Sequence, residues 1–323
     1  MSTQHQSSLV GKTVLITGGA GFIGSNLARH LISIGIRVRI LDNLSNGSRA
    51  NIQDLDVEFI HGDVCDYATC LRACQGVVAV SHQAALGSVP RSFKTPYDSI
   101  RSNVVGFTAI IHAAKESGIR RFVYASSSSV YGTDKSTFKT EETVGRILSP
   151  YAGTKKIDEE LANIYSFLEM DCIGFRYFNI FGPYQDPRGD YAAVIPRFIL
   201  KMLSGESPTI NGDGTASRDF TYVANAVHAN YLALTTANRE AFGQVFNVGT
   251  TGSITINEIH QHINRIIKAD VSANHGPPRQ GDVPFSRASI EKGGRLLGYT
   301  PQVSFLQGLE QTVKWFAAQM PRS

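Results

Sequence analysis

A glycine-rich turn near the N-terminus constrains the fold more than any other feature. The segment TGGAGFIG, Thr17–Gly24, places Gly18, Gly21 and Gly24 at intervals of three residues. It follows the apolar run Thr13–Thr17, which predicts a strand, and it opens a helical pattern of apolar residues. Glycines allow a pyrophosphate to approach the backbone, and the helix N-terminus supplies free N–H groups and partial positive charge. The sequence therefore predicts a strand–turn–helix unit that binds a dinucleotide.

An acidic residue at the end of the next strand predicts which dinucleotide binds. Val38–Leu41 is a second apolar run, and Asp42 follows it with neither Arg nor Lys directly after. A carboxylate here accepts hydrogen bonds from the adenosine ribose and repels the 2′-phosphate of NADP, so we expect NAD. Asp63 follows the third predicted strand and has two interpretations. It binds the adenine amino group, or it is the N-cap of a helix over 64–73.

Strands and helices alternate through the first part of the chain. Further strands are predicted at 57–60, 77–80, 122–125 and 172–176, and long helices at 103–116 and 151–168. This order predicts an α/β fold with a doubly wound parallel sheet, of the Rossmann type. After Phe181 the chain is richer in polar loops. We therefore expect a Rossmann domain over 1–181, to which later segments return, and a smaller α/β substrate lobe over mainly 182–323.

Composition excludes several classes of function. The net charge of +4 over 323 residues lacks the clustered basic stripes of nucleic-acid-binding proteins. No apolar run approaches the ~18 residues of a membrane span, and the first ten residues do not resemble a signal peptide. The four cysteines form no CxxC pair, so we expect ordinary buried or partly buried thiols and no metal site. These features predict a cytoplasmic protein with a small-molecule ligand.

A serine cluster and a tyrosine–lysine pair carry the predicted chemistry. Ser126–Gly132 (SSSSVYG) lies at the carboxyl end of the fifth strand, where open α/β sheets bind ligands. Tyr151 and Lys155 lie four residues apart and share one helix face. The ammonium group favours the phenolate, which makes Tyr151 a general base near neutral pH. The pair alone is common in helices, but the serine cluster and glycine turn make it specific for hydride chemistry at a carbinol carbon.

Together these motifs resemble the extended branch of the short-chain dehydrogenase/reductase superfamily, over nearly the whole chain. The resemblance implies that Ser127 and Tyr151 contact the reacting hydroxyl, while Lys155 holds the nicotinamide ribose and tunes Tyr151. It also implies a homodimer built on the two long helices. The NAD-contacting residues that it implies are Gly18, Gly21, Phe22, Ile23, Gly24, Asp42, Asn43, Ser45, Gly47, Asp63, Val64, Ala84, Ala85, Asn103, Ser126, Tyr151, Lys155 and Tyr177.

The serine motif narrows the reaction. Related dehydratases and decarboxylases carry an acid within it, whereas this chain has Ser128 and Ser129 there. Without that acid, the resemblance implies a 4-epimerase of UDP-sugars that works through a 4-keto intermediate. A non-catalytic NAD-binding protein is disfavoured, because such proteins usually lose the tyrosine or the lysine.

The segment HQAALGSVPRS, 82–92, resembles the bacterial UDP-N-acetylglucosamine 4-epimerases. Ser286 falls at that family's gatekeeper position, where a small residue admits a 2-acetamido group without excluding glucose. The resemblance thus implies exchange of UDP-GlcNAc with UDP-GalNAc, and also of UDP-Glc with UDP-Gal. The substrate-binding residues that it implies are Gly87, Ser88, Ser127, Ser128, Ser129, Asn179, Gln185, Ala193, Val194, Asn211, Arg218, Arg279, Asp282 and Ser286.

Two alternatives stay open. Arg218 pairs with Asp219 or Asp213, and Arg279 with Asp282, if the two arginines do not bind the pyrophosphate. Tyr184 stands where such epimerases often have Arg, and Arg188 and Asp190 add charge to its loop. If this loop lines the sugar site, a UDP-uronate 4-epimerase, acting on GlcA or GlcNAcA, becomes the second candidate.

Overall fold

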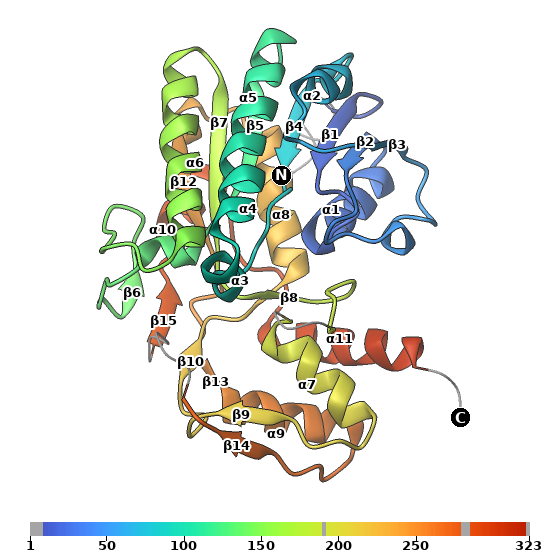
Figure 1. Ribbon diagram of the computed structural model, residues 1–323, viewed down its shortest axis with the longest axis vertical. Helices are drawn as coiled ribbons and strands as arrows, with labels where there is room; N and C mark the ends of the chain where they lie inside the picture. The colour runs from blue at the N-terminus through green and yellow to red at the C-terminus, as the bar shows by residue number, and fades with distance from the viewer. Residues whose placement is uncertain (1–8, 189–191, 279–284, 321–323) are drawn as a thin grey trace.

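A seven-stranded parallel sheet forms the larger part of the computed structural model, which describes residues 9–188, 192–278 and 285–320 (Figure 1). The strand order is β12-β7-β5-β4-β1-β2-β3. The strands are β1 (Thr13–Thr17), β2 (Arg37–Asp42), β3 (Glu58–His61), β4 (Ala79–His82), β5 (Arg121–Ser127), β7 (Asp171–Tyr177) and β12 (Gln244–Val248). The six predicted strands are all present, with ends shifted by at most two residues, and the predicted fold class is confirmed.

The seventh strand was not predicted. β12 pairs in parallel with β7, with Phe246 opposite Phe175, although it lies more than sixty residues after that strand. Its sequence, QVFNV, carries the polar Asn247 at a fully buried position. Asn247 is satisfied by the hydroxyl of Tyr131 and the carbonyls of Lys139 and Ser289. The local pattern therefore lacks the apolar run that indicates an interior strand.

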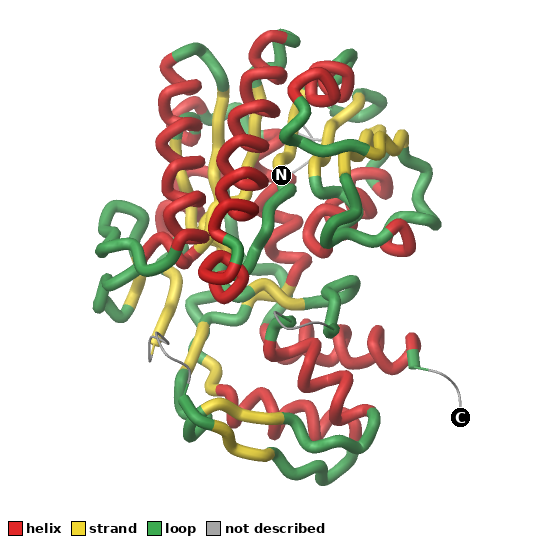
Figure 2. Tube along the Cα trace, viewed as in Figure 1, coloured by secondary structure: helices red, strands yellow, loops and turns green. Residues whose placement is uncertain are grey.

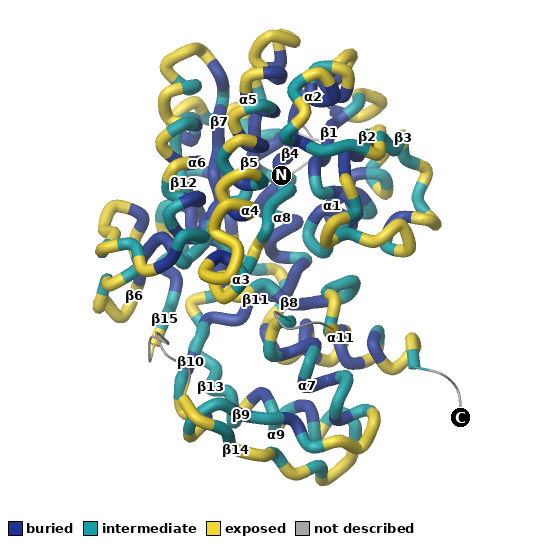
Figure 3. The backbone as a smooth tube through the Cα atoms, viewed as in Figure 1, coloured by how far each residue is buried: buried dark blue, intermediate teal, exposed yellow. Residues whose placement is uncertain are grey.

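Helices cover both faces of the sheet. α1 (Phe22–Ser33) and α8 (Val223–Thr235) pack together on one face, while α2 (Tyr67–Cys74), α5 (Gly106–Glu116) and α6 (Pro150–Phe167) cover the other (Figure 1). Residues of β1 alternate accordingly. Val14 and Ile16 join the core that contains Leu27, whereas Leu15 joins the core that contains Phe107. Figure 3 shows the buried strands between helices whose outer surfaces are exposed.

The second predicted long helix is confirmed, and the first begins irregularly. Before α5 come α3 (Val89–Lys94), α4 (Pro96–Ile100) and a π-helical turn, Arg101–Val105. Short 3-10 turns lie at Arg49–Asn51, Ser128–Tyr131 and Arg239–Ala241. The four cysteines are free thiols, three buried and Cys65 partly exposed, as predicted.

A smaller lobe lies below the sheet in Figures 1 and 2. Its helices are α7 (Val194–Leu203), α9 (Ile256–Ile267) and α11 (Phe305–Gln319), and β9 (Thr209–Asn211) pairs with β14 (Asn274–Gly276). Phe198 of α7 and Leu309 of α11 belong to the same core cluster as Leu27, so the lobe and the sheet share one hydrophobic core.

A four-stranded sheet joins the two parts, in the order β13-β10-β15-β6. These strands are short: β6 (Phe138–Lys139), β10 (Ser217–Arg218), β13 (Ile254–Thr255) and β15 (Phe285–Ala288). β8 (Ile180–Phe181) pairs with β11 (Thr221–Tyr222), and α10 (Glu291–Leu297) packs near β12. Among the described residues, no helix is long and apolar enough to cross a membrane.

Candidate active site

A cleft of about 1920 Å³ opens along the carboxyl ends of the parallel strands. Typical small-ligand pockets measure ~300–1,000 Å³, so this cleft has room for two large ligands. The predicted residues on its wall are Gly18, Gly21, Phe22, Ile23, Gly24, Asp42, Asn43, Ser45, Gly47, Val64, Ala84, Ala85, Gly87, Ser88, Ser126, Ser127, Ser128, Ser129, Tyr151, Lys155, Tyr177, Asn179, Gln185, Ala193, Arg218 and Ser286. Most of the predicted site is therefore brought together in one space.

Two glycines of the turn lie so close to other backbone atoms that a residue with a side chain could not replace either of them. A Cβ on Gly18 would lie 2.6 Å from the backbone nitrogen of Ala84, and Gly18 has a φ of +66°. A Cβ on Gly24 would lie 2.3 Å from the carbonyl oxygen of Gly18. Gly21 is the N-cap of α1 and has no side chain to satisfy the first N–H groups. The backbone at the start of α1 thus fits the pyrophosphate of a dinucleotide.

Asp42 ends β2 and is held rigidly at the cleft wall. Its Oδ2 accepts a hydrogen bond from the backbone N–H of Ala20 at 2.9 Å, and its Oδ1 accepts from that of Leu44 at 2.7 Å. Each carboxylate oxygen has a second lone pair, which suits it to a ribose hydroxyl. The wall residues at the start of α1 and at the end of β2 therefore fit NAD.

Asp63 is not the N-cap of a helix, and its contact with the adenine amino group stays a prediction. Within the described residues the cleft wall includes its neighbours Gly62 and Val64 but not Asp63. Its Oδ1 accepts from the backbone N–H of Cys65, and its Oδ2 lies 3.3 Å from Arg101. The N-cap interpretation is wrong, because α2 begins at Tyr67 and the capping side chain is that of Asp66.

Asn103 supports the wall from behind it. This fully buried amide accepts from the backbone N–H of Leu86 at 2.8 Å and donates to Thr154 Oγ1 at 3.0 Å. It therefore ties the segment after β4 to α6, and the described part of the cleft wall does not include it.

The predicted catalytic residues meet at the junction of β5 and α6. Ser149 caps α6, since its Oγ accepts from the backbone N–H of Ala152, and Pro150 occupies the first turn. Tyr151 and Lys155 follow on one face of this helix, and Ser127 ends β5. All three side chains line the same cleft.

A buried carboxylate that sequence reasoning missed lies behind this site. Asp158 Oδ2 is 3.1 Å from Lys155 Nζ, and both side chains are almost completely excluded from solvent. Burial raises the pKa of Asp158 to about 6, against the opposing effect of Lys155. The only available signal was its place three residues after Lys155 on a helix, which many surface residues share.

A second buried ion pair fixes the serine strand to α6. Glu159 accepts hydrogen bonds from Ser126 Oγ at 2.6 Å and from Arg176 Nε and Nη2 at 2.9 Å each. Burial alone would raise the pKa of Glu159, but the hydrogen bonds and charge of Arg176 outweigh it and lower that pKa. The position of Ser126 at the cleft is thereby determined by packing beneath it.

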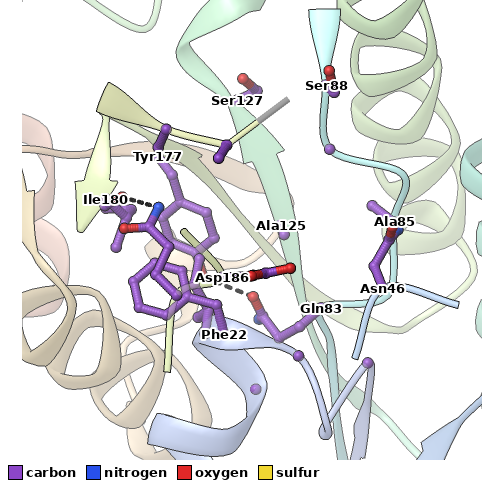
Figure 4. A pocket seen from close by; sticks show the side chains of 18 of the residues that line it. Phe22, Asn46, Gln83, Ala85, Ser88, Ala125, Ser127, Tyr177, Ile180 and Asp186 are labelled. Carbon is purple, nitrogen blue, oxygen red and sulfur yellow. Dashed lines mark hydrogen bonds between the residues drawn. The ribbon is translucent and has the colours of Figure 1, made fainter. Parts of the chain in front are cut away.

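Tyr177, Gln83 and Phe22 come from three separate elements and converge in the view of Figure 4. The Tyr177 hydroxyl donates to Gln83 Oε1 at 3.2 Å and accepts from Asn230 Nδ2 at 2.7 Å. Gln83 and Asn230 were not predicted, and nothing in their local sequence singles them out.

Arg218 and Ser286 are paired by register. They are opposite residues on the parallel strands β10 and β15. Asp219, which the sequence offered only as a possible partner of Arg218, is completely buried and accepts from the backbone N–H groups of Thr250, Thr251 and Ala288. Its carboxylate thus joins three segments behind Arg218 and Ser286.

The remaining predicted substrate residues are placed differently. Val194 begins α7 and Asn211 ends β9, and the described cleft wall includes neither. Arg279 and Asp282 lie outside the described residues. Asn179 Nδ2 donates to the carbonyl of Asp219, and Gln185 Nε2 donates to the carbonyl of Ile180.

The loop around Tyr184 rests against α1 and α11. The Tyr184 ring packs on Trp315 with centroids 5.0 Å apart, and the Arg29 guanidinium lies 4.3 Å from its centre. Asn26 of α1 also donates to the carbonyl of Pro183. The Tyr184 ring therefore packs against residues of α1 and α11, and these contacts do not involve the serine motif.

Among the described residues, no group of three or more His, Cys, Asp or Glu side chains is arranged to hold a metal ion.

The model of the NAD dependent epimerase/dehydratase family matches residues 14–249. This chain belongs to that family. The predicted resemblance to extended short-chain dehydrogenase/reductases is confirmed, and NAD is the cofactor.

Members with different sugars in their names are similarly close. The chain is 36% identical to a UDP-glucose 4-epimerase of Mycolicibacterium smegmatis, over 94% of this chain and 97% of that one. It is 32% identical to UDP-glucuronate 4-epimerase 4 of Arabidopsis thaliana, over 95% and 76%. A solved UDP-N-acetylglucosamine 4-epimerase from Methanobrevibacter ruminantium M1, in complex with UDP-N-acetylmuramic acid, superposes with a TM-score of 0.91 at 35% identity, over 96% and 100%. These similarities establish the family but do not distinguish between the sugars. The choice of sugar therefore has to be argued from the site residues.

Proposed function

We propose that this protein is a UDP-sugar 4-epimerase that exchanges UDP-GlcNAc with UDP-GalNAc and also accepts UDP-Glc and UDP-Gal. One observation carries the proposal. Ser128, Ser129 and Ser286, whose side chains are short and neutral, line the same cleft as Tyr151 and Lys155. We call Ser128, Ser129, Asn179, Arg218 and Ser286 the sugar end of the cleft.

Acid–base chemistry in this cleft falls to Tyr151. Its phenolate takes the proton from the 4-hydroxyl of the sugar and later returns it to the same oxygen, as C4 is inverted. When bound, NAD would supply a reversible hydride acceptor for C4, so the reaction has no net redox change. Ser127 holds the reacting oxygen by a hydrogen bond, and Lys155 holds the nicotinamide ribose.

The sugar end suits a substrate whose sugar ring must rotate within the cleft during the reaction. The 4-keto sugar rotates about its diphosphate linkage while the nucleotide stays anchored. Arg218 supports the anchor, since its planar guanidinium binds phosphate oxygens in pairs. The short serines make few contacts that rotation would break. Arg279 and Asp282 complete the proposed nucleotide site, as the family resemblance implies.

Elimination or decarboxylation would need an acid beside the serine motif. Asp134 lies on the cleft wall, but its carboxylate binds Lys139 Nζ at 3.2 Å and Ser136 Oγ at 2.5 Å. Both side chains of this ion pair are largely buried. A carboxylate engaged in this way is poorly suited to proton transfer, which supports epimerisation.

A UDP-uronate 4-epimerase is the second candidate, because Arg188 also lies on the cleft wall. Two contacts weigh against it. Lys139 directs its ammonium protons to Asp134 Oδ2 and to the carbonyls of Asp134 and Ser136. Tyr184 is occupied by Arg29 and Trp315. The ammonium group of Lys139 is therefore engaged elsewhere. Tyr184, which stands where such epimerases often have Arg, supplies no cation for a sugar carboxylate.

Side-by-side turnover of UDP-GlcNAc, UDP-glucose, UDP-glucuronate and UDP-GlcNAc uronate tests the proposal. Formation of UDP-GalNAc that depends on Tyr151 supports it. Turnover of a uronate without turnover of UDP-GlcNAc would replace it with the second candidate.

We also propose a homodimer formed through α6 and its neighbours. Ile157, Ile164 and Phe167 of α6 are 45%, 54% and 80% exposed, which is unusual for such large apolar side chains on one helix. Sedimentation equilibrium tests this. A monomer at micromolar concentration would contradict it.

A further inference from the structure

The Lys155–Asp158 pair is a charged contact directly behind the cleft. The two residues lie one helical turn apart on α6, and the exposed fractions of their side chains are 1% and 0%. Asp158 Oδ2 accepts from Lys155 Nζ at 3.1 Å, while its buried Oδ1 has no hydrogen-bond partner among the described residues. A buried carboxylate depends on such a cation, because water cannot solvate it.

The other titratable groups around this pair do not balance Asp158. Glu159 on the same helix is held by Arg176 of β7. His82 of β4 is buried beside Lys155, and burial followed by the charge of Lys155 lowers its pKa to about 3. Burial raises the pKa of Tyr124 on β5 well above its usual value, and Asp158 adds to that effect. At neutral pH, His82 and Tyr124 are uncharged, so Asp158 and Lys155 balance one another.

The contact between Lys155 and Asp158 affects how readily Tyr151 acts as a base. The positive charge of Lys155 favours the phenolate form of Tyr151, and a carboxylate 3.1 Å from the ammonium opposes that field. The same contact fixes the end of a side chain that otherwise has four rotatable bonds. Asp158 therefore acts on both the place and the effective charge of the ammonium group.

We propose that Asp158 is a positioning residue that holds Lys155 Nζ beneath the reacting site and sets the pH at which Tyr151 becomes a phenolate. The proposal rests on the roles of Tyr151 and Lys155 given under the proposed function. Because burial raises the pKa of Asp158 to about 6, the residue loses its charge in mild acid. The field of Lys155 is then unopposed, which preserves the phenolate where acid would otherwise remove it.

A spectroscopic titration of Tyr151 tests this without depending on turnover. The phenolate is followed by ultraviolet difference spectroscopy of the NAD-loaded protein, with the Tyr151→Phe form of each variant subtracted. Asp158→Asn removes the charge while keeping the shape. We expect its titration midpoint to move to lower pH by roughly 0.5–1 unit, a smaller effect than that of a directly contacting charge. Asp158→Glu should restore the midpoint toward that of the wild type.

Two further variants complete the design. Glu160→Gln removes an exposed carboxylate two residues along the same helix, and it should leave the midpoint unchanged. Asp158→Ala is a second neutral variant, used if Asp158→Asn does not fold. An unchanged midpoint in a folded neutral variant would show that Asp158 only packs the core and would overturn the proposal.

Turnover separates this proposal from the proposed function. If the midpoint shifts but no UDP-sugar is epimerised by the wild type, the role of Asp158 stands and the proposed function fails. If UDP-GlcNAc is epimerised and the acid limb of kcat/KM does not move in Asp158→Asn, the role of Asp158 fails and the proposed function stands.

Discussion

Tyr151 and Lys155 share one face of a single helix, whereas the sugar end of the cleft is assembled from separate segments. Ser128 and Ser129 follow β5, Asn179 lies between β7 and β8, and Arg218 and Ser286 sit on two short strands. The spacing of the first pair is set by helix geometry, and buried carboxylates fix it from behind. The sugar end depends on tertiary contacts between distant segments. The proposed chemistry therefore depends on one local unit, and the proposed substrate choice on contacts between distant segments.

The largest loss of activity is expected from a change in the helix that carries Tyr151 and Lys155. Tyr151→Phe should reduce kcat by at least ~10²-fold, because general acid–base groups contribute ~10²–10⁴-fold. NAD should remain bound, which retained cofactor absorbance after gel filtration would show. Epimerisation of UDP-GlcNAc above about a hundredth of the wild-type rate would remove Tyr151 from the role of base.

A smaller and more selective effect is expected at the sugar end. Ser286→Tyr should narrow the space beside the 2-substituent and lower kcat/KM for UDP-GlcNAc by about 10–100-fold, as misfits of this size usually do. Turnover of UDP-glucose should change little. Equal losses for the two sugars, measured in the same assay, would show that Ser286 does not select between them.

The contacts behind the sugar end should affect binding more than chemistry. Asp219→Ala removes a carboxylate that accepts from three backbone N–H groups, and we expect a loss of about 3 kcal/mol in the free energy of unfolding. In the folded fraction, KM should rise while kcat is largely kept, because Arg218 and Ser286 lose their support. A fall in kcat with an unchanged KM would place Asp219 in the catalytic unit instead.

The last effect concerns the pH dependence of stability near the catalytic unit. His82 is completely buried, its Nδ1 lies 2.7 Å from Thr17 Oγ1, and its folded-state pKa is lowered to about 3. Unfolded histidine titrates near ~6.5. The folded state therefore stays unprotonated while the unfolded chain gains a proton, and stability present above pH ~6.5 is lost as the pH falls toward 3.

His82→Gln should reduce this pH slope by about 1.4 kcal/mol per pH unit, measured by urea unfolding between pH 6 and 4. His61→Gln, at an exposed position on β3, is the matched control. If both variants have the slope of the wild type, His82 does not stay unprotonated in the folded protein.

Local patterns were enough to predict the catalytic unit. The glycine turn, Asp42 and the Tyr151–Lys155 spacing each depend on neighbours within one element, so their placement follows from the sequence. Asp158 shows the limit of this reasoning, because three-residue spacing on a helix does not indicate burial. Asp63 shows another limit, since Asp66 competes for the same cap and is the residue that takes it.

The sugar end was predicted mostly through family resemblance. Asp219, Gln83 and Asn230 act through partners far away in the chain, and no periodicity marks them. β12 was missed for a related reason. Its buried Asn247 is satisfied by β6 and by residues near β15, which no local window contains.

The late arrival of β12 has a consequence for how the protein is made. When the chain has been synthesised up to Phe181, six of the seven strands of the sheet are already present, and the last of them is β7. Until Gln244–Val248 emerges, β7 presents an unpaired edge, and such edges pair readily with other chains. A fragment that ends at Phe181 should therefore aggregate, although it contains Tyr151, Lys155 and the whole glycine turn. The proposed catalytic residues are encoded early, but the nascent sheet stays vulnerable until the strand that protects its edge has been synthesised.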